Sequence, residues 1–290
     1  MTVSIAHLGP VGTYSEAAAL LCAEWWQHHT GASAELCPFP SIVKALQAAA
    51  TEQTPLAVVP VENSIEGSVA ITLDTLWRLD GLSIQQALVL PISHALLSCA
   101  GGFDAIQTVY SHPQALAQCQ GWLEKHLPQA RLVATQSTTE VLQNLEAEPN
   151  MGAIASQRAA QLYNLPVLAH PINDQADNCT RFWVVSAAAI AFPSMGEKSY
   201  SSLAFSLPKN VPGALVKPLQ IFAQRNLNLS RIESRPTKRS LGEYLFFIDI
   251  EASLEAESVQ SALAELKDCT ETLKIFGSYS IQIASLSGVV

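Results

Sequence analysis

The stretch Asp177-Asn178-Cys179-Thr180-Arg181-Phe182 runs directly into Trp183-Val184-Val185. Residues 182–185 are bulky and apolar, so they predict a buried strand that begins at a polar mouth. Arg181 has a planar fork of donors that suits a carboxylate, and Thr180 and Asn178 can hydrogen-bond a reacting oxygen. The simpler alternative is a turn that precedes a strand, with Arg181 in solvent. The rest of the chain is needed to choose between the two.

The composition indicates a globular protein with a large core. The chain has 290 residues, of which 49% are hydrophobic and 14% charged, so two domains, or a large and a small one, are expected. No stretch predicts a membrane span, and the N-terminus lacks the basic and apolar pattern of a signal peptide. The six cysteines form no CxxC pair, which favours reduced thiols in a cytoplasmic protein over disulfides or zinc.

The charge is unevenly distributed along the chain. Residues 1–197 hold 6 Lys or Arg and 16 Asp or Glu, a net charge of −10, whereas residues 198–290 hold 10 and 9, a net charge of +1. Nucleic acid is therefore not an expected partner. Because basic side chains are scarce in the first part, an anionic ligand there would depend on helix N-termini and backbone amides.

Apolar runs in the first part alternate with helix-start signals. A Ser or Thr follows an apolar run, and Glu or Gln comes three residues later, as in a capping box. These pairs are Thr13 and Glu16, Ser111 and Gln114, and Ser137 and Glu140, with looser versions at Ser41 and Ser156. The alternation predicts parallel sheets covered by helices, with ligands outside the carboxyl ends of the strands.

Two loops that follow predicted strands are candidates for ligand binding. Gly9-Pro10-Val11-Gly12 matches neither the dinucleotide-binding pattern GxGxxG nor a P-loop. Glu62, Asn63 and Ser64 stand together after the apolar strand at residues 55–60, which favours a site over an ordinary turn.

The order of elements predicts two lobes, followed by a linker and a C-terminal domain. The chain is expected to cross from a first lobe (about 1–78 and 170–187) into a second lobe (about 79–169), near 78–84, and to return near 165–172. Two crossings make a hinged cleft like that of periplasmic solute-binding proteins. Residues 188–200 are predicted to form a linker.

Residues 201–283 are predicted to form a ferredoxin-like βαββαβ domain. Its first helix is expected to begin at residues 212–215 and to run to about Asn226, with a bend at Pro218. The last strand is expected at residues 273–283.

Six segments together resemble the prephenate dehydratase family, and they keep that family's order over nearly the whole chain. GPVGTYSE (9–16), VPVENSIEGSV (59–69), SHPQALAQC (111–119) and DNCTRF (177–182) resemble its catalytic domain. NVPGALVKPL (210–219) and IESRP (232–236) resemble the ACT regulatory domain that follows it. Since the first strand begins at residue 3, the single-function form without a chorismate mutase is expected.

The resemblance implies that the protein converts prephenate to phenylpyruvate, with loss of carbon dioxide and of the ring hydroxyl as water. Thr180 would face the departing hydroxyl, and either Glu62 or a water would supply it with a proton. The other substrate-binding residues would be Thr13, Asn63, Ser64, Ser111, Gln114, Asn178 and Arg181. No metal or organic cofactor is expected.

The resemblance also implies feedback inhibition by phenylalanine through the ACT domain. The matching phenylalanine-binding residues are Gly213, Ala214 and Leu215, and Glu233, Ser234, Arg235 and Pro236. Binding between two ACT domains would require a homodimer or a homotetramer.

Two other functions remain open at this point. Arogenate dehydratase performs the same chemistry on the amino analogue of prephenate. A cytoplasmic amino-acid sensor without catalytic activity would use the two lobes only for binding.

Overall fold

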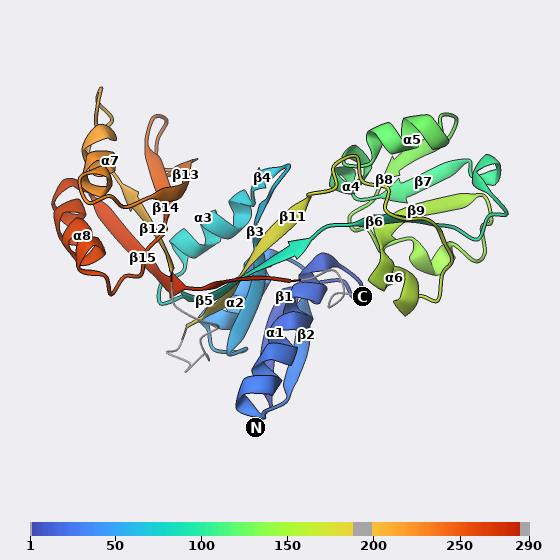
Figure 1. Cartoon of the computed structure of the whole chain (residues 1–290), viewed down its shortest axis with the longest axis horizontal. Helices are drawn as coiled ribbons and strands as arrows, with labels where there is room; N and C mark the ends of the chain where they lie inside the picture. The colour runs from blue at the N-terminus through green and yellow to red at the C-terminus, as the bar shows by residue number, and fades with distance from the viewer. Residues whose placement is uncertain (1, 188–198, 285–290) are drawn as a thin grey trace.

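The computed structural model describes residues 2–187 and 199–284, which form three sheets with their helices (Figure 1). The predicted linker falls almost entirely outside the described residues. No helix within 2–187 and 199–284 has the length and apolarity that a membrane crossing requires.

Lobe one is built on a mixed sheet of order β16-β5-β11-β3-β1-β2, with β4 paired to β3. Strands β1, β2 and β3 are parallel, and β11 runs antiparallel to both β3 and β5. The strands are β1 (Val3–Leu8), β2 (Ala34–Phe39), β3 (Leu56–Asn63), β4 (Gly67–Ser68), β5 (Ser83–Pro91), β11 (Cys179–Ser186) and β16 (Ile281–Ile283). The helices are α1 (Tyr14–Thr30), α2 (Ile42–Ala50) and α3 (Ala70–Arg78).

Lobe two has a sheet of order β10-β6-β9-β7-β8. Its strands are β6 (His94–Leu97), β7 (Thr108–Ser111), β8 (Arg131–Ala134), β9 (Met151–Ser156) and β10 (Val167–Ala169). Its helices are α4 (Pro113–Ala117), α5 (Gln120–His126) and α6 (Gln157–Leu162), with short 3₁₀ turns η1 (Phe103–Ala105) and η2 (Leu142–Asn144).

The chain crosses into lobe two at residues 92–93, about ten residues later than predicted. Strand β5 still belongs to lobe one, where it pairs with β11 along its whole length. The return lies between β10 and β11, within residues 170–178. The apolar run at residues 82–98 contains two strands of different sheets, and local sequence does not record which sheet a buried strand joins.

Three of the five predicted helix starts are confirmed. Thr13, Ser41 and Ser156 each cap a helix through a side-chain oxygen that accepts a backbone N–H. A helix also follows Ser111, since α4 begins at Pro113, but the side chain that caps it is that of His112. The start at Ser137 is wrong, since the described chain between β8 and β9 forms turns and the 3₁₀ turn η2.

The C-terminal domain has the predicted order βαββαβ. Its elements are β12 (Tyr200–Ser206), α7 (Val216–Ala223), β13 (Leu229–Pro236), β14 (Tyr244–Ile250), α8 (Glu257–Cys269) and β15 (Thr272–Tyr279), with sheet order β13-β14-β12-β15. Helix α7 begins later than predicted. Pro218 therefore lies in the first turn of α7, where backbone N–H groups form no hydrogen bond within the helix. The N–H that proline lacks is not needed there, so the bend expected at Pro218 does not arise.

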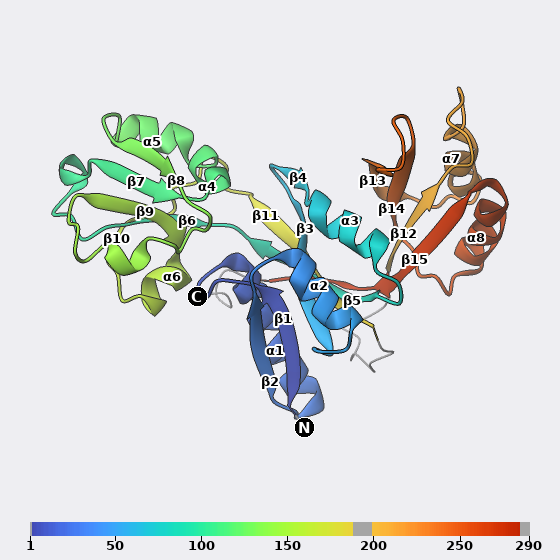
Figure 2. The same cartoon turned by 180° about the vertical axis from the view of Figure 1, so that it is seen from behind.

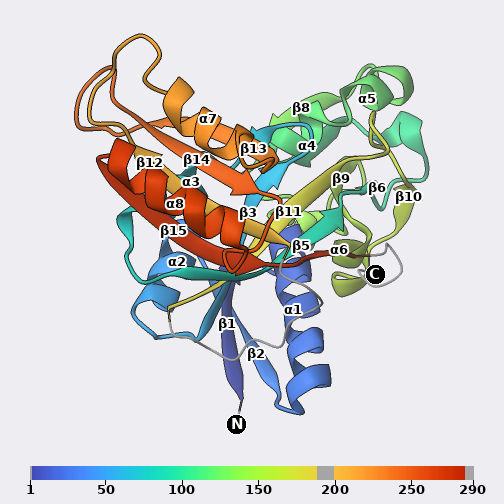
Figure 3. The ribbon, with the colours of Figure 1, turned by 60° about the vertical axis from the view of Figure 1, so that its left-hand side comes forward.

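The predicted last strand is in fact two strands of different sheets. Strand β15 completes the C-terminal sheet, and β16 leaves it to pair in parallel with β5 of lobe one. Figure 3 shows β15 leading into the segment that lies beside β5. The end of the described chain is thus part of lobe one.

The C-terminal sheet also shares a hydrophobic core with lobe one. Helices α7 and α8 cover its outer face, and its other face packs on lobe one, with α3 at the boundary (Figure 2). Phe247 and Tyr279 contact the rings of Trp77 and Trp183, with ring centroids 6.5 and 6.3 Å apart. Burial of such large rings stabilises the contact by about 1.5–3 kcal/mol each.

Candidate active site

A cavity of about 1060 Å³ lies between lobe one and lobe two. Lobe one contributes the loop after β1, the start of α1 and the ends of β3 and β11. Lobe two contributes residues of β6 and α4 and the turn at residues 136–140. A cleft between lobes, near the carboxyl ends of parallel strands, is where α/β folds of this kind bind ligands.

The N-terminus of α1 opens into this cavity. Thr13, Tyr14 and Ser15 line it, and no hydrogen bond is formed by the backbone N–H of Tyr14 or Ser15 among the described residues. The lining residues include no Lys or Arg. The cavity therefore offers an anion the free amides and positive dipole end of a long helix.

The loop before α1 needs a glycine. Gly12 has a φ of +85°, and a Cβ there would lie 3.1 Å from the side chain of Thr139 in lobe two. The N–H of Gly12 donates to the carboxylate of Glu16 at 2.8 Å, and Glu16 pairs with Arg158 of lobe two at 3.2 Å. These contacts join the two lobes at the cavity.

Thr180 and Asn63 face each other on neighbouring strands at the cavity wall. The Nδ2 of Asn63 donates to the Oγ1 of Thr180 at 3.0 Å, and the Oδ1 of Asn63 accepts the N–H groups of Ile65 and Glu66, both at 3.1 Å. Those two amides fix the orientation of the Asn63 side chain. Since Thr180 Oγ1 accepts from Asn63, its own O–H is left to donate toward the cavity.

A buried hydrogen-bond chain extends from Asn63 into lobe two. Asn63 Nδ2 donates to Asn178 Oδ1 at 2.9 Å, and Asn178 Nδ2 donates to Gln118 Oε1 at 2.9 Å. Gln118 Oε1 also lies 3.0 Å from His94 Nε2. Because Gln118 presents an acceptor, His94 must donate from Nε2. Burial lowers the pKa of His94, against a smaller opposite effect of its Gln118 contact.

Glu62 and Arg181 do not reach the cavity. Arg181 Nη2 donates to Glu62 Oε2 at 2.6 Å and to Asp249 Oδ2 of the C-terminal domain at 2.8 Å. This placement gives no support to the expectation that Glu62 supplies a proton to Thr180. The reason for the placement is strand alternation: Arg181 pairs with Glu62 and Thr180 with Asn63, and neighbouring residues of a strand point to opposite faces, so Glu62 and Arg181 lie on the face opposite Asn63 and Thr180.

Three further residues predicted to bind substrate instead form hydrogen bonds within the protein next to the cavity. Ser111 is buried and donates to the carbonyl of Ile154 at 2.7 Å, and Asn178 belongs to the buried chain. Ser64 accepts the N–H of Cys179 at 3.0 Å. Of the nine predicted catalytic and substrate-binding residues, the cavity lining includes Thr13, Asn63, Gln114 and Thr180.

Two residues of the site were missed by the sequence analysis. Gln118 follows Gln114 by four positions, and that spacing alone indicates a shared face of a helix. His94 carried no comparable signal, because a single histidine before an apolar strand is most often an ordinary core residue.

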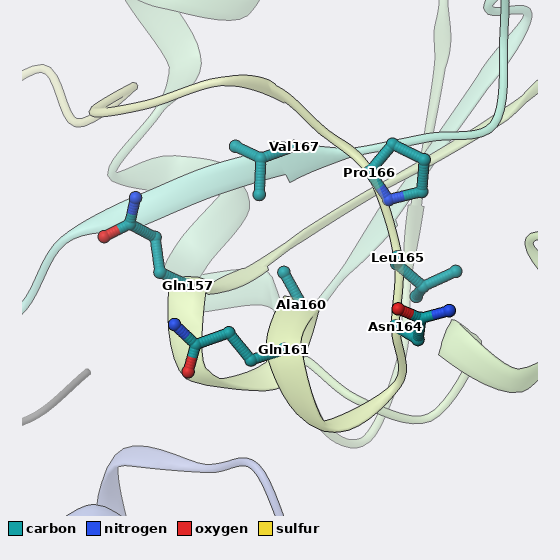
Figure 4. A pocket seen from close by; sticks show the side chains of 7 residues that line it. All are labelled: Gln157, Ala160, Gln161, Asn164, Leu165, Pro166 and Val167. Carbon is teal, nitrogen blue, oxygen red and sulfur yellow. The ribbon is translucent and has the colours of Figure 1, made fainter.

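Two hollows outside the cleft between the lobes lack these features. Figure 4 shows one of about 430 Å³ in lobe two, whose polar side chains are the amides Gln157, Gln161 and Asn164. Another, of about 690 Å³ in the C-terminal domain, is lined by Gly213, Ala214 and Leu215, but residues 233–236 do not line it. The described residues contain no cluster of three or more His, Cys, Asp or Glu arranged to hold a metal ion.

Comparison with known families now decides the assignment. The family model for prephenate dehydratase matches residues 5–189, and the model for the ACT domain matches residues 201–268. The chain belongs to the prephenate dehydratase family. The predicted fold class, a two-lobed catalytic domain followed by an ACT domain, is confirmed.

Individual relatives agree with this assignment. The chain is 39% identical to the bifunctional chorismate mutase/prephenate dehydratase of Aquifex aeolicus, over 96% of this chain and 73% of that protein. It is 34% identical to the prephenate dehydratase of Lactococcus lactis subsp. cremoris, over 96% of this chain and 98% of that one. The solved prephenate dehydratase of Arthrobacter aurescens in complex with L-Phe has a TM-score of 0.84 and 34% identity, over 96% of this chain and 90% of that chain.

Proposed function

We propose that the cavity between the lobes is the catalytic site and that Thr180 donates to the departing hydroxyl. The reaction is that of the family, the conversion of prephenate to phenylpyruvate in phenylalanine biosynthesis, which makes the protein a carbon–oxygen lyase. One ring carboxylate leaves as carbon dioxide, and its bonding electrons complete the aromatic ring. The ring hydroxyl leaves with a proton, as water.

The hydrogen-bond polarity at Thr180 is the observation that carries this proposal. Its Oγ1 is occupied as an acceptor by Asn63, so its O–H is the group available to the substrate hydroxyl. A threonine is a weak acid, so a further proton source must replenish it. Of the two proton sources considered for Thr180, Glu62 lies on the other face of the sheet, so we propose that a water in the cavity supplies the proton.

The pyruvyl carboxylate of prephenate needs a different partner from the leaving carboxylate. We infer that it lies at the N-terminus of α1, where Thr13 and the free amides of Tyr14 and Ser15 face the cavity. A carboxylate held by neutral amides in a partly enclosed site is oriented without a strong ion pair. The ring carboxylate, which must leave, then meets no Lys or Arg of the lining.

Phenylalanine is the proposed inhibitor, bound at residues 213–215 and 233–236. A related enzyme was solved with L-Phe, and this chain has the same ACT domain. The hollow lined by residues 213–215 does not include residues 233–236 of the same chain. A site shared between two ACT domains would bring both segments together, so we propose a homodimer or homotetramer, acting in the cytoplasm.

Kinetics on two substrates test the proposal. The purified chain should form phenylpyruvate from prephenate and should be slower with arogenate, and phenylalanine should inhibit it. Equal or faster turnover of arogenate would assign the protein to arogenate dehydration. Binding of phenylalanine without turnover of either substrate would identify an amino-acid sensor.

A further inference from the structure

The residue next to Thr180 is held by the C-terminal domain. Arg181 lies on the opposite face of β11, where its Nη2 contacts Asp249 at 2.8 Å. Asp249 is on β14 and is completely buried. A group of the C-terminal domain thus fixes the strand position adjacent to the proposed proton donor.

Asp249 is shared between two arginines of different domains. Besides Arg181, it accepts from Arg231 Nε at 2.8 Å and Nη2 at 3.3 Å, and from Ser202 Oγ at 2.6 Å. Burial would raise the pKa of Asp249, but the arginines and Ser202 outweigh it and lower that pKa. Asp249 is therefore a charged link, and Arg231 also lies over the ring of Trp183 on β11, at 5.5 Å.

Strand β13 presents alternate residues to lobe one. Glu233 accepts from the Oγ of Ser68 at 3.2 Å, and Arg235 makes two contacts with Asp74, at 3.1 and 3.2 Å. Arg231 lies two residues earlier on the same strand and also approaches Ser68, at 3.4 Å. The proposed effector segment 233–236 therefore cannot shift without affecting the contacts of Arg231.

Two short connections lead from β13 to Thr180. The first runs from Arg231 through Asp249 to Arg181, the neighbour of Thr180 in sequence. The second runs through Ser68 of β4, which follows the turn whose two backbone amides, those of Ile65 and Glu66, orient Asn63. The first connection consists of side-chain hydrogen bonds largely removed from solvent, where such contacts are strongest.

We propose that Asp249 is a positioning residue for Thr180, and that through it the effector segment controls the active site. Asp249 holds β11 by Arg181 and β13 by Arg231, so an amino acid bound on β13 that displaces Arg231 changes the support of Thr180. The effector acts only to the extent that it binds one arrangement of these contacts better than the other. This inference rests on the proposed function and names the connection by which that site is regulated.

The test is Asp249→Asn with Asp80→Asn as the matched control. Asp80 also pairs across the domain boundary, with Lys274 at 2.9 Å, but it does not contact β11. For Asp249→Asn we expect at least a tenfold higher phenylalanine concentration for half-inhibition, with a severalfold lower kcat and a KM within twofold of the wild-type value. Asp80→Asn should match the wild type in all three quantities.

Asp249→Asn removes the charge that Arg231 and Arg181 share, and Arg181 then keeps only Glu62 as an ion-pair partner, so this variant could fail to fold; a second variant covers that outcome. Arg231→Lys keeps the positive charge beside Asp249 but lacks the fork that contacts it twice. It should also weaken inhibition, and Arg231→Gln should weaken it further. If the folded variants at positions 249 and 231 are inhibited like Asp80→Asn, the inference is wrong. If the wild-type protein itself is inactive, or is not inhibited by phenylalanine, the proposed function fails instead.

Discussion

Replacement of Thr180 by valine tests the proposed chemistry at a single atom. Valine has nearly the same shape as threonine, so the change removes the hydroxyl and little else. The two hydrogens of Asn63 Nδ2 are shared among three acceptors, and without Thr180 Oγ1 they still have Asn178 Oδ1 at 2.9 Å and the carbonyl of Cys179 at 3.1 Å. The free energy of unfolding should therefore change by only about 1 kcal/mol.

The catalytic effect should be far larger than the effect on stability. A positioned proton donor contributes about 10²–10⁴-fold to a rate, which corresponds to roughly 3–5 kcal/mol of activation free energy. Thr180→Ser retains the hydroxyl and should lose less than about tenfold in kcat. The assay is phenylpyruvate formation from prephenate, with thermal unfolding of each variant as the control. A Thr180→Val enzyme within threefold of the wild-type kcat would refute the assignment.

Three further predictions concern the frame of the site. Burial lowers the pKa of His7 and His94 below 6.5, so the folded state binds fewer protons than the unfolded state, and the stability this contributes is complete above pH 6.5 and is lost as the pH falls. The free energy of unfolding, measured by denaturation, should be higher at pH 7.5 than at pH 5, and greater stability at pH 5 would contradict the prediction. Burial raises the pKa of Cys22 and Cys119 to about 12, so a maleimide should label neither in the native protein, and native labelling of either would count against the buried packing. Truncation after residue 187 should uncover Trp183 and its neighbours at about 1.5–3 kcal/mol for each large side chain, and an equally stable fragment in thermal unfolding would disprove the shared core.

Much of the architecture was predictable because the capping residues and the order of strand and helix patterns in the sequence match those of the folded protein. Capping residues at positions 13, 41 and 156 marked real helix starts, and the βαββαβ order of the C-terminal domain followed from period and turn residues. The place of β5 and β16 in the sheet of lobe one was not predictable in this way. The composition of either strand is compatible with more than one sheet, and only tertiary pairing decides which sheet it extends.

The site was only partly predictable, for a related reason. Asn63 and Thr180 were identified from their places at two strand ends, and they do meet at the cavity. Glu62 was misplaced because it was grouped with its neighbour Asn63, although neighbouring residues of a strand point to opposite faces. The contacts of Arg181 with Asp249 join positions 68 residues apart, which period and spacing do not reveal.

A crystal structure of Thr180→Ser with prephenate, trapped at low temperature, tests the central claim most directly. We expect the ring hydroxyl within about 3.0 Å of the residue 180 Oγ. We also expect the pyruvyl carboxylate at the first amides of α1, and Asn63 still donating to residue 180. A substrate bound with its ring hydroxyl away from residue 180, or held outside the cavity between the lobes, would contradict the account.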